Sequence, residues 1–210
     1  MDDSAKRDTL LLQVLRDVPF DGWNGGVIAA AGARLGLAPG EATTLFPAGA
    51  RDAVAAFSRW ADREMLAALA VQDLAAMKVR ERIAAAVHAR LAVLEPHREA
   101  VRRALALLAM PHNVALSLRL LYATVDAMWY AAGDTATDFN FYSKRGLLAA
   151  VYAATTLYWL DDRSPGAADT QAFLERRLGD VMTLPRYGAR LRERLDRLPN
   201  PLRLLRPARR

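Results

Sequence analysis

The 210-residue sequence contains no cysteine. This absence excludes disulfide bonds, zinc sites built from thiolates, and catalysis by a thiol nucleophile. Only three histidines are present, His88, His97 and His112, and none has the spacing to a carboxylate or a second histidine that a metal site between helices requires. No set of acid, base and metal ligands can therefore be assembled from the sequence. We expect a protein without enzymatic activity, metal or cofactor.

Long apolar segments without charge are also missing. The run from Gly146 to Leu160 is shorter than the ~20 residues that a membrane-spanning helix needs. It therefore predicts a buried core helix. Near the amino terminus, Asp2, Asp3 and Asp8 stand where a secretory signal peptide would carry positive charge. These features predict a protein that is soluble or peripheral to a membrane.

Alanine and leucine dominate the composition, β-branched residues are sparse, and 53% of the residues are hydrophobic. Such a composition argues against disorder and favours an all-helical fold. No segment alternates with a period of two over the length of a strand. Prolines and glycines divide the chain into expected helices at about 6–18, 24–36, 39–46, 50–74, 77–94, 95–109, 112–132, 139–160 and 169–184. We predict three parts: a three-helix module at 1–49, a helical domain at 50–185 and a basic amphipathic tail at 186–210.

The positive charge is concentrated in that tail. Residues 186–210 hold nine arginines against Glu193 and Asp196, whereas the rest of the chain is close to neutral, with 20 basic and 21 acidic side chains. Apolar residues recur every three or four positions, and arginines occupy the faces between them, which is typical of a helix lying on an anionic membrane. Packing on the body of the protein or on a partner subunit is the alternative. The residues predicted to meet the membrane are Tyr187, Arg190, Leu191, Arg194, Leu195, Leu198 and Leu202.

Three short helices followed by longer ones resemble the layout of TetR-type regulators. The segment Ile28–Gly36 resembles the first element of their helix-turn-helix. However, no lysine or arginine lies between Leu35 and Ala50, where Glu41 is the only charged residue. DNA binding depends on basic side chains that neutralise phosphates and on side chains that reach base edges. We therefore predict a structural module that binds no nucleic acid; the alternative is a TetR-type transcriptional regulator that senses a ligand.

Aromatic and charged residues gather between two apolar helical segments, at residues 126–161. Trp129 and Tyr130 point about 100° apart on a helix, so a core position for one tends to expose the other. An interface role and a partly buried core role both remain open for this pair. Asp138 is interpreted as a helix cap, and Lys144 and Arg145 are expected to face solvent or to pair with the nearby aspartates.

The same region resembles the Coq-nine family of ubiquinone-biosynthesis accessory proteins. The residues that carry the resemblance are Asp126-x-x-Trp129-Tyr130-x-x-Gly133-Asp134-x-x-x-Asp138-Phe139-Asn140-x-Tyr142-x-Lys144-Arg145, followed by Tyr152-x-x-Thr155. The resemblance extends to Leu45-Phe46-Pro47, Arg80-Glu81-Arg82-Ile83, Arg90-Leu91, Pro96-His97 and Ala109-x-Pro111. It is specific near Trp129 and generic in the alanine-rich helices.

The resemblance implies an all-α, TetR-like helical bundle without DNA binding, a homodimer, an apolar pocket for isoprenoid quinone or another lipid, and a membrane-binding carboxy-terminal amphipathic helix. It also implies that Asp126, Trp129 and Tyr130 dock onto demethoxyubiquinone hydroxylase or an equivalent enzyme. We expect the helices at 112–132 and 142–160 to line the pocket, with lipid contacts from Leu116, Leu120, Leu121, Val125, Met128, Leu148, Tyr152 and Leu157. The alanine and arginine content suits a bacterial protein. We expect it in the cytoplasm, peripheral on the inner face of the cytoplasmic membrane.

Overall fold

The computed structural model describes residues 3–133 and 139–181, and residues 186–210 therefore lie outside the described part. Within the described ranges the chain is helical and contains no β-strand, which confirms the predicted all-α fold.

Across the same ranges no single helix is long and apolar enough to cross a membrane. Two segments that meet at a 99° bend, Val79–Leu108 and Pro111–Ala131, reach that length and composition together.

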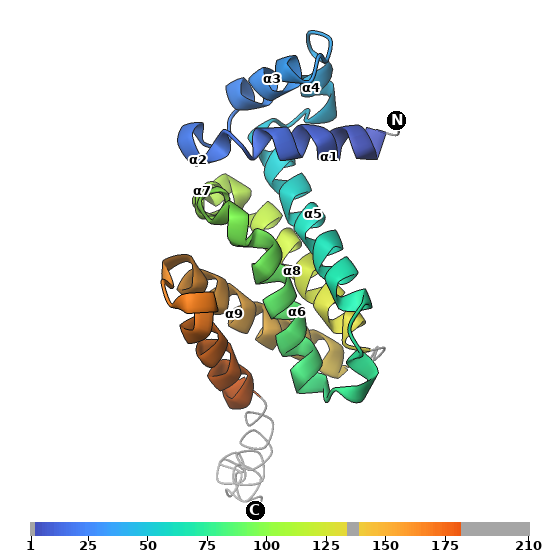
Figure 1. Ribbon diagram of the computed structural model, residues 1–210, viewed down its shortest axis with the longest axis vertical. Helices are drawn as coiled ribbons and strands as arrows, with labels where there is room; N and C mark the ends of the chain where they lie inside the picture. Colours follow the sequence, from blue (N-terminus) through green and yellow to red (C-terminus); the bar gives the residue numbers. More distant parts are fainter. Residues whose placement is uncertain (1–2, 134–138, 182–210) are drawn as a thin grey trace, which may run out of the picture.

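Four short helices form a module at one end of the molecule (Figure 1). They are α1 (Asp3–Val14), α2 (Val18–Asp21), α3 (Gly25–Arg34) and α4 (Glu41–Leu45). The single helix expected at 6–18 is wrong in its extent, because the chain turns after Val14 and starts α2 at Val18. Pro19 lies in the first turn of α2, where its missing N–H leaves no hydrogen bond unmade. The side chain of Asn24 caps α3 by accepting a hydrogen bond from the backbone of Val27.

The long helix α5 runs from this module into a bundle of helices (Figure 1). The bundle comprises α5 (Ala50–Ala70), α6 (Val79–Leu94), α7 (Arg98–Leu108), α8 (Val114–Ala131), α9 (Phe139–Asp161) and a further helix at 168–181. Helix α5 packs against α6 and α8, and α8 packs against α9. Short 3₁₀ turns precede α7 and α8, each with a proline in its first turn. These prolines explain why the breaks before α7 and α8 could be predicted from the sequence.

One hydrophobic core joins the module to the bundle. It includes Leu10 of α1 and Phe46 after α4 as well as Met65 of α5 and Trp159 of α9. Polar contacts strengthen the junction: the indole Nε1 of Trp23 donates a hydrogen bond of 3.0 Å to the backbone oxygen of Ala100. The guanidinium of Arg103 in α7 likewise donates to the backbone oxygen of Pro19 over 2.9 Å. A displacement of α7 would therefore also displace α2 and Trp23 in the module.

Glu41, the single charged residue between Leu35 and Ala50, makes its contacts within the module. Its carboxylate accepts hydrogen bonds from the backbone N–H of Ala38 and from the Lys6 ammonium, each 3.2 Å long. These two contacts, that from Ala38 first, lower the pKa of Glu41 below its ordinary value. The segment offers no cation to a phosphate, which fits a structural role for the module.

Close packing of α3 on α4 depends on Gly32. A Cβ atom at this position would lie 2.7 Å from the Cβ of Ala42 and 3.6 Å from a methyl group of Leu37. Gly32→Ala is therefore expected to lower the free energy of unfolding by about 1–3 kcal/mol, because the two helices must separate. Gly25→Ala, where a Cβ meets nothing within 4 Å, is the matched control and should be neutral or slightly stabilising. Denaturant titration compares the two; equal effects would contradict this account of the packing.

Candidate functional site

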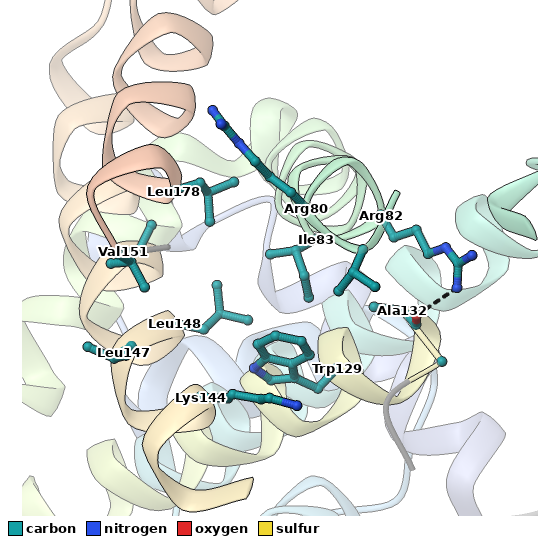
Figure 2. A pocket seen from close by; sticks show the side chains of 13 residues that line it. Arg80, Arg82, Ile83, Trp129, Ala132, Lys144, Leu147, Leu148, Val151 and Leu178 are labelled. Atoms are coloured by element: carbon teal, nitrogen blue, oxygen red, sulfur yellow. Dashed lines mark hydrogen bonds between the residues drawn. The ribbon is translucent and has the colours of Figure 1, made fainter. Parts of the chain in front are cut away.

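A cavity of about 360 Å³ opens between the start of α6, the end of α8, α9 and the helix at 168–181. We call it the Trp129 cavity. Its apolar wall is formed by Val79, Ile83, Trp129, Ala132, Leu147, Leu148, Val151, Leu178 and Val181. Figure 2 shows Leu148, Val151 and Leu178 facing Ile83 across the space, with the indole of Trp129 at its base. The volume lies in the usual range for small-molecule sites, about 300–1,000 Å³.

The indole of Trp129 has an unmet hydrogen-bonding capacity. The side chain is only 8% exposed, and its Nε1 finds no acceptor among the described residues. A buried donor without a partner costs about 1–3 kcal/mol. The ammonium of Lys144 lies 5.7 Å from the centre of the ring, in cation–π contact.

Two arginines border the Trp129 cavity, and both direct their charge at protein oxygens. Arg82 donates to the backbone oxygen of Ala132 over 3.1 Å, which caps the end of α8, and to that of Met77 over 2.9 Å. Arg80 donates to the carboxylate of Glu175 over 2.7 Å. The cavity thus combines an apolar interior with a polar rim, an arrangement that suits an amphipathic molecule.

Beside this cavity lies the surface that the sequence predicted to bind a partner. Tyr130 is 77% exposed, whereas Trp129 is buried, so the two adjacent aromatics do face different environments. Asp126 accepts a hydrogen bond of 2.7 Å from Arg145, which confirms the expected pairing and ties α8 to α9. The Asp126 side chain remains 59% exposed. The side chains of Tyr130 and Asp126 are therefore available on the surface, whereas that of Trp129 is not. The expected cap at Asp138 lies outside the described residues.

A second cavity, of about 220 Å³, lies between α5, α6, α7, α8 and α9. We call it the Arg90 cavity. Most of its wall is apolar, from Val54, Phe57, Leu94, Val101, Ala104, Leu105, Leu108, Leu120, Leu121, Ala153 and Leu157. Polar groups also line it, those of Ser58, Arg90, Ser117, Thr124, Tyr152 and Thr156. No residue lines both cavities.

Arg90 is the centre of a buried polar network. Its Nε donates to Oδ1 of Asp62 over 2.8 Å, and its Nη1 donates to the hydroxyl of Tyr152 over 2.8 Å. Its Nη2 contacts Ser58 and the hydroxyl of Thr124, which in turn donates to Asp62. Burial alone would lower the pKa of Arg90, but its contacts with Tyr152 and Asp62 outweigh that effect and raise the pKa. The guanidinium is therefore charged at any physiological pH.

The eight residues predicted to contact lipid do not line a single pocket: five of them line two different cavities, and three line neither. Leu148 lines the Trp129 cavity. Four of them line the Arg90 cavity: Leu120, Leu121, Tyr152 and Leu157. Leu116 packs in a small cluster with Ala55 and Leu120, while Val125 and Met128 are fully buried in the main core and line neither cavity. The predicted membrane contacts, Tyr187, Arg190, Leu191, Arg194, Leu195, Leu198 and Leu202, all lie outside the described residues.

Sequence reasoning missed several cavity residues. Leu178 and Val181 come from a helix far from the aromatic region and carry no local signal, whereas Ile83 belongs to a segment, Arg80–Ile83, that the family resemblance included. Arg90 did have a signal, because it and His88 are the two polar residues in the stretch of α6 from Ile83 to Leu94.

Within the described ranges no group of His, Asp or Glu side chains is arranged to hold a metal ion. His97 packs edge-on against the rings of Phe57 and Trp60. Burial lowers the pKa values of His88 and His97. His97 thus takes part in packing.

Comparison with known proteins is consistent with these features. The family model described as COQ9 matches residues 114–185. The human protein named "Ubiquinone biosynthesis protein COQ9, mitochondrial" is 35% identical over 182 residues, covering 83% of this chain and 57% of its own length. The Drosophila melanogaster protein of that name is 30% identical over 184 residues, covering 86% and 56%. The chain thus spans little more than half the length of these relatives.

A solved structure shares the fold. The crystal structure of the TetR transcriptional regulator from Nitrosomonas europaea ATCC 19718 matches with a TM-score of 0.70. The match covers 85% of this chain and 98% of that one, at 20% sequence identity. This likeness confirms the predicted TetR-like bundle; at such identity it shows the fold alone.

Proposed function

The chain belongs to the COQ9 family, and from this premise we propose that it is a non-catalytic accessory protein of ubiquinone biosynthesis. It binds an isoprenoid quinone intermediate and presents it to a demethoxyubiquinone hydroxylase. The observation that carries the proposal is the position of the Trp129 cavity, an apolar space of about 360 Å³ whose base, Trp129, adjoins the exposed Tyr130. A ligand site and a docking surface then share one stretch of α8.

The chemistry of the cavity supports a lipid with an oxygen-bearing head group. Burial of each CH₂ group of a polyprenyl tail against Leu148, Val151 and Leu178 contributes about 0.8 kcal/mol. The ammonium of Lys144, which lies over the indole of Trp129 and lines the cavity, can donate to a quinone or methoxy oxygen. Arg80 and Arg82 keep the rim of the cavity polar. None of these groups is placed to perform acid–base or metal chemistry.

Reconstitution tests the whole proposal. Hydroxylase is added to vesicles that contain demethoxyubiquinone, with and without this chain, and the hydroxylated quinone is measured. The chain should increase the rate and produce no product in the absence of the enzyme. An unchanged rate, together with no binding between the two proteins, would contradict the proposal.

Tyr130→Ala is expected to weaken hydroxylase binding by about tenfold or more, because exposed tyrosines at interface centres contribute about 2 kcal/mol. Stability should remain unchanged, since Tyr130 is 77% exposed. Phe20→Ala is the matched control: this aromatic, on α2 at the module end, is 80% exposed and lies outside the proposed surface. Surface plasmon resonance with immobilised hydroxylase measures both variants. Equal losses, or none, would place the docking surface elsewhere.

The tail is proposed to bind an anionic membrane through its leucine stripe and its arginines. Truncation after Pro185 should abolish flotation with anionic vesicles while the body stays folded. Flotation of the full chain should weaken at high salt, because screening reduces the attraction of the arginines. Leu191→Ser combined with Leu195→Ser should reduce flotation even at low salt. A truncated chain that unfolds, with no flotation of the full chain, would show that the tail is a packing helix.

A homodimer through α8 is part of the proposal. Val114, Leu118 and Tyr122 follow one another at intervals of four residues and are 44–53% exposed, so they form one apolar stripe on the helix surface. A second copy of the chain is the partner we propose for this stripe. Sedimentation analysis tests it, and a monomer at micromolar concentration would contradict it.

The alternative is a TetR-type regulator, favoured only by the shared fold. The absence of basic residues between Leu35 and Ala50 opposes it. A sequence-selective DNA footprint at physiological salt that depends on residues 39–46 would establish the regulator instead.

A further inference from the structure

The Arg90 cavity is separate from the Trp129 cavity and smaller. Its volume of about 220 Å³ lies below the range of about 300–1,000 Å³ that is usual for drug-sized ligands. It therefore suits a molecule no larger than a substituted ring. Its walls come from α5, α6, α7, α8 and α9, and none of its residues takes part in the site proposed above.

Two side chains of this cavity, Tyr152 and Arg90, have donor hydrogens that the hydrogen bonds among the described residues leave unused. The hydroxyl of Tyr152 accepts a hydrogen bond from Nη1 of Arg90, but its own hydrogen has no acceptor among the described residues. Nη1 of Arg90 uses one of its two hydrogens in this bond. Both carboxylate oxygens of Asp62 are already engaged, by Arg90 and by Thr124. The network can therefore donate to an oxygen that enters the cavity.

The charges of Arg90 and Asp62 already balance each other, so the network favours an uncharged ligand. Asp62 already neutralises the guanidinium of Arg90, at 2.8 Å, and both side chains are largely buried. A carboxylate in the cavity would compete with Asp62 for Arg90 and would lose its own hydration. Water can meet the donors of Tyr152 and Arg90, but the wall around Phe57, Leu105 and Leu121 is apolar and offers it no partner.

We propose that the Arg90 cavity is a second binding site, for a small, uncharged and mainly apolar molecule with a carbonyl or ether oxygen that accepts a hydrogen bond from the Tyr152 hydroxyl. The apolar body of the ligand packs against Val54, Leu105 and Leu121. The site does not depend on the lipid proposed for the Trp129 cavity. Helix α7, which supplies Val101, Ala104 and Leu105 to this wall, also holds α2 through the bond between Arg103 and Pro19.

Two probes of almost identical shape show how much the hydrogen bond from the Tyr152 hydroxyl contributes to binding. Acetophenone carries a carbonyl oxygen where α-methylstyrene carries a methylene group. The full chain, titrated with each and followed by NMR, should bind acetophenone about two- to tenfold more tightly, because one neutral hydrogen bond contributes about 0.5–1.5 kcal/mol. Tyr152→Phe should remove this preference. Tyr158→Phe, a change on the same helix at a side chain that is 41% exposed and lines neither cavity, should retain it.

Intermolecular NOEs locate the probe in the unaltered protein and do not depend on whether Tyr152→Phe folds. The proposal requires NOEs from acetophenone to the rings of Tyr152 and Phe57. Equal affinity for the two probes, a preference that survives in folded Tyr152→Phe, or NOEs only to Ile83 and Leu178 of the Trp129 cavity would each overturn it. Loss of lipid binding in the Trp129 cavity would leave these NOEs unchanged, so the two proposals fail separately.

Discussion

Replacing Asp62 by alanine is expected to lower the free energy of unfolding by about 3–5 kcal/mol, because the charge of Arg90 is then left buried among neutral partners. Arg90 is 5% exposed, and its only ion pair in the described residues is the one with Asp62. Thr124 would also lose the carboxylate to which it donates. Denaturant titration at neutral pH measures the loss.

Glu175→Ala is the matched control for that experiment. It breaks the ion pair between Arg80 and Glu175, which has a similar length of 2.7 Å but whose side chains are 41% and 51% exposed. Exposed pairs contribute about 0–1 kcal/mol, so the control should be close to the unaltered protein. Asp62→Leu with Arg90→Met, which removes both charges, should recover much of the loss. Equal costs for the double variant and for Asp62→Ala would show that the unpaired charge is not the cause.

Trp129→Ala should lower the free energy of unfolding by about 3–5 kcal/mol, as truncation of a large buried aromatic usually does. Trp129 is 8% exposed and belongs to the main core. Tyr130→Ala, one residue along and 77% exposed, should stay within about 0.5 kcal/mol of the unaltered protein. Thermal and denaturant unfolding compare the two variants.

This difference matters for tests of the docking surface. A variant lacking both aromatics would lose hydroxylase binding through unfolding as well as through lost contacts, so Tyr130 must be tested alone. If Trp129→Ala kept full stability, the indole would be a surface group and the cavity described around it would be wrong.

The sequence predicted the helices well because prolines and glycines mark their ends. Pro96 and Pro111 lie in turns that start new helices, as expected from their missing N–H. The first helix was predicted to end too late because Pro19 was interpreted as ending a helix, whereas it lies in the first turn of α2. Local patterns do not distinguish these two positions of a proline.

The cavities could be predicted only in part. Leu148 and Tyr152 were expected to line one pocket, and each lines a different one, because adjacent faces of α9 meet different helices. Arg90 pairs with Asp62, 28 residues away, and this contact depends on how α5 and α6 lie side by side. No local sequence pattern predicts how α5 packs against α6. The pairing of Arg145 with a nearby aspartate was one of two alternatives that the sequence left open, and the structure shows it with Asp126.

Mass spectrometry of the lipid extracted from the purified chain tests whether the Trp129 cavity binds an isoprenoid quinone. We expect an isoprenoid quinone or its precursor, and a marked loss of that lipid in Val151→Trp, which fills the Trp129 cavity. Val71→Trp, at a position that is 87% exposed and lines neither cavity, should retain the lipid. Protein that is consistently empty and takes up no added quinone, or lipid that is retained equally in both variants, would contradict the claim.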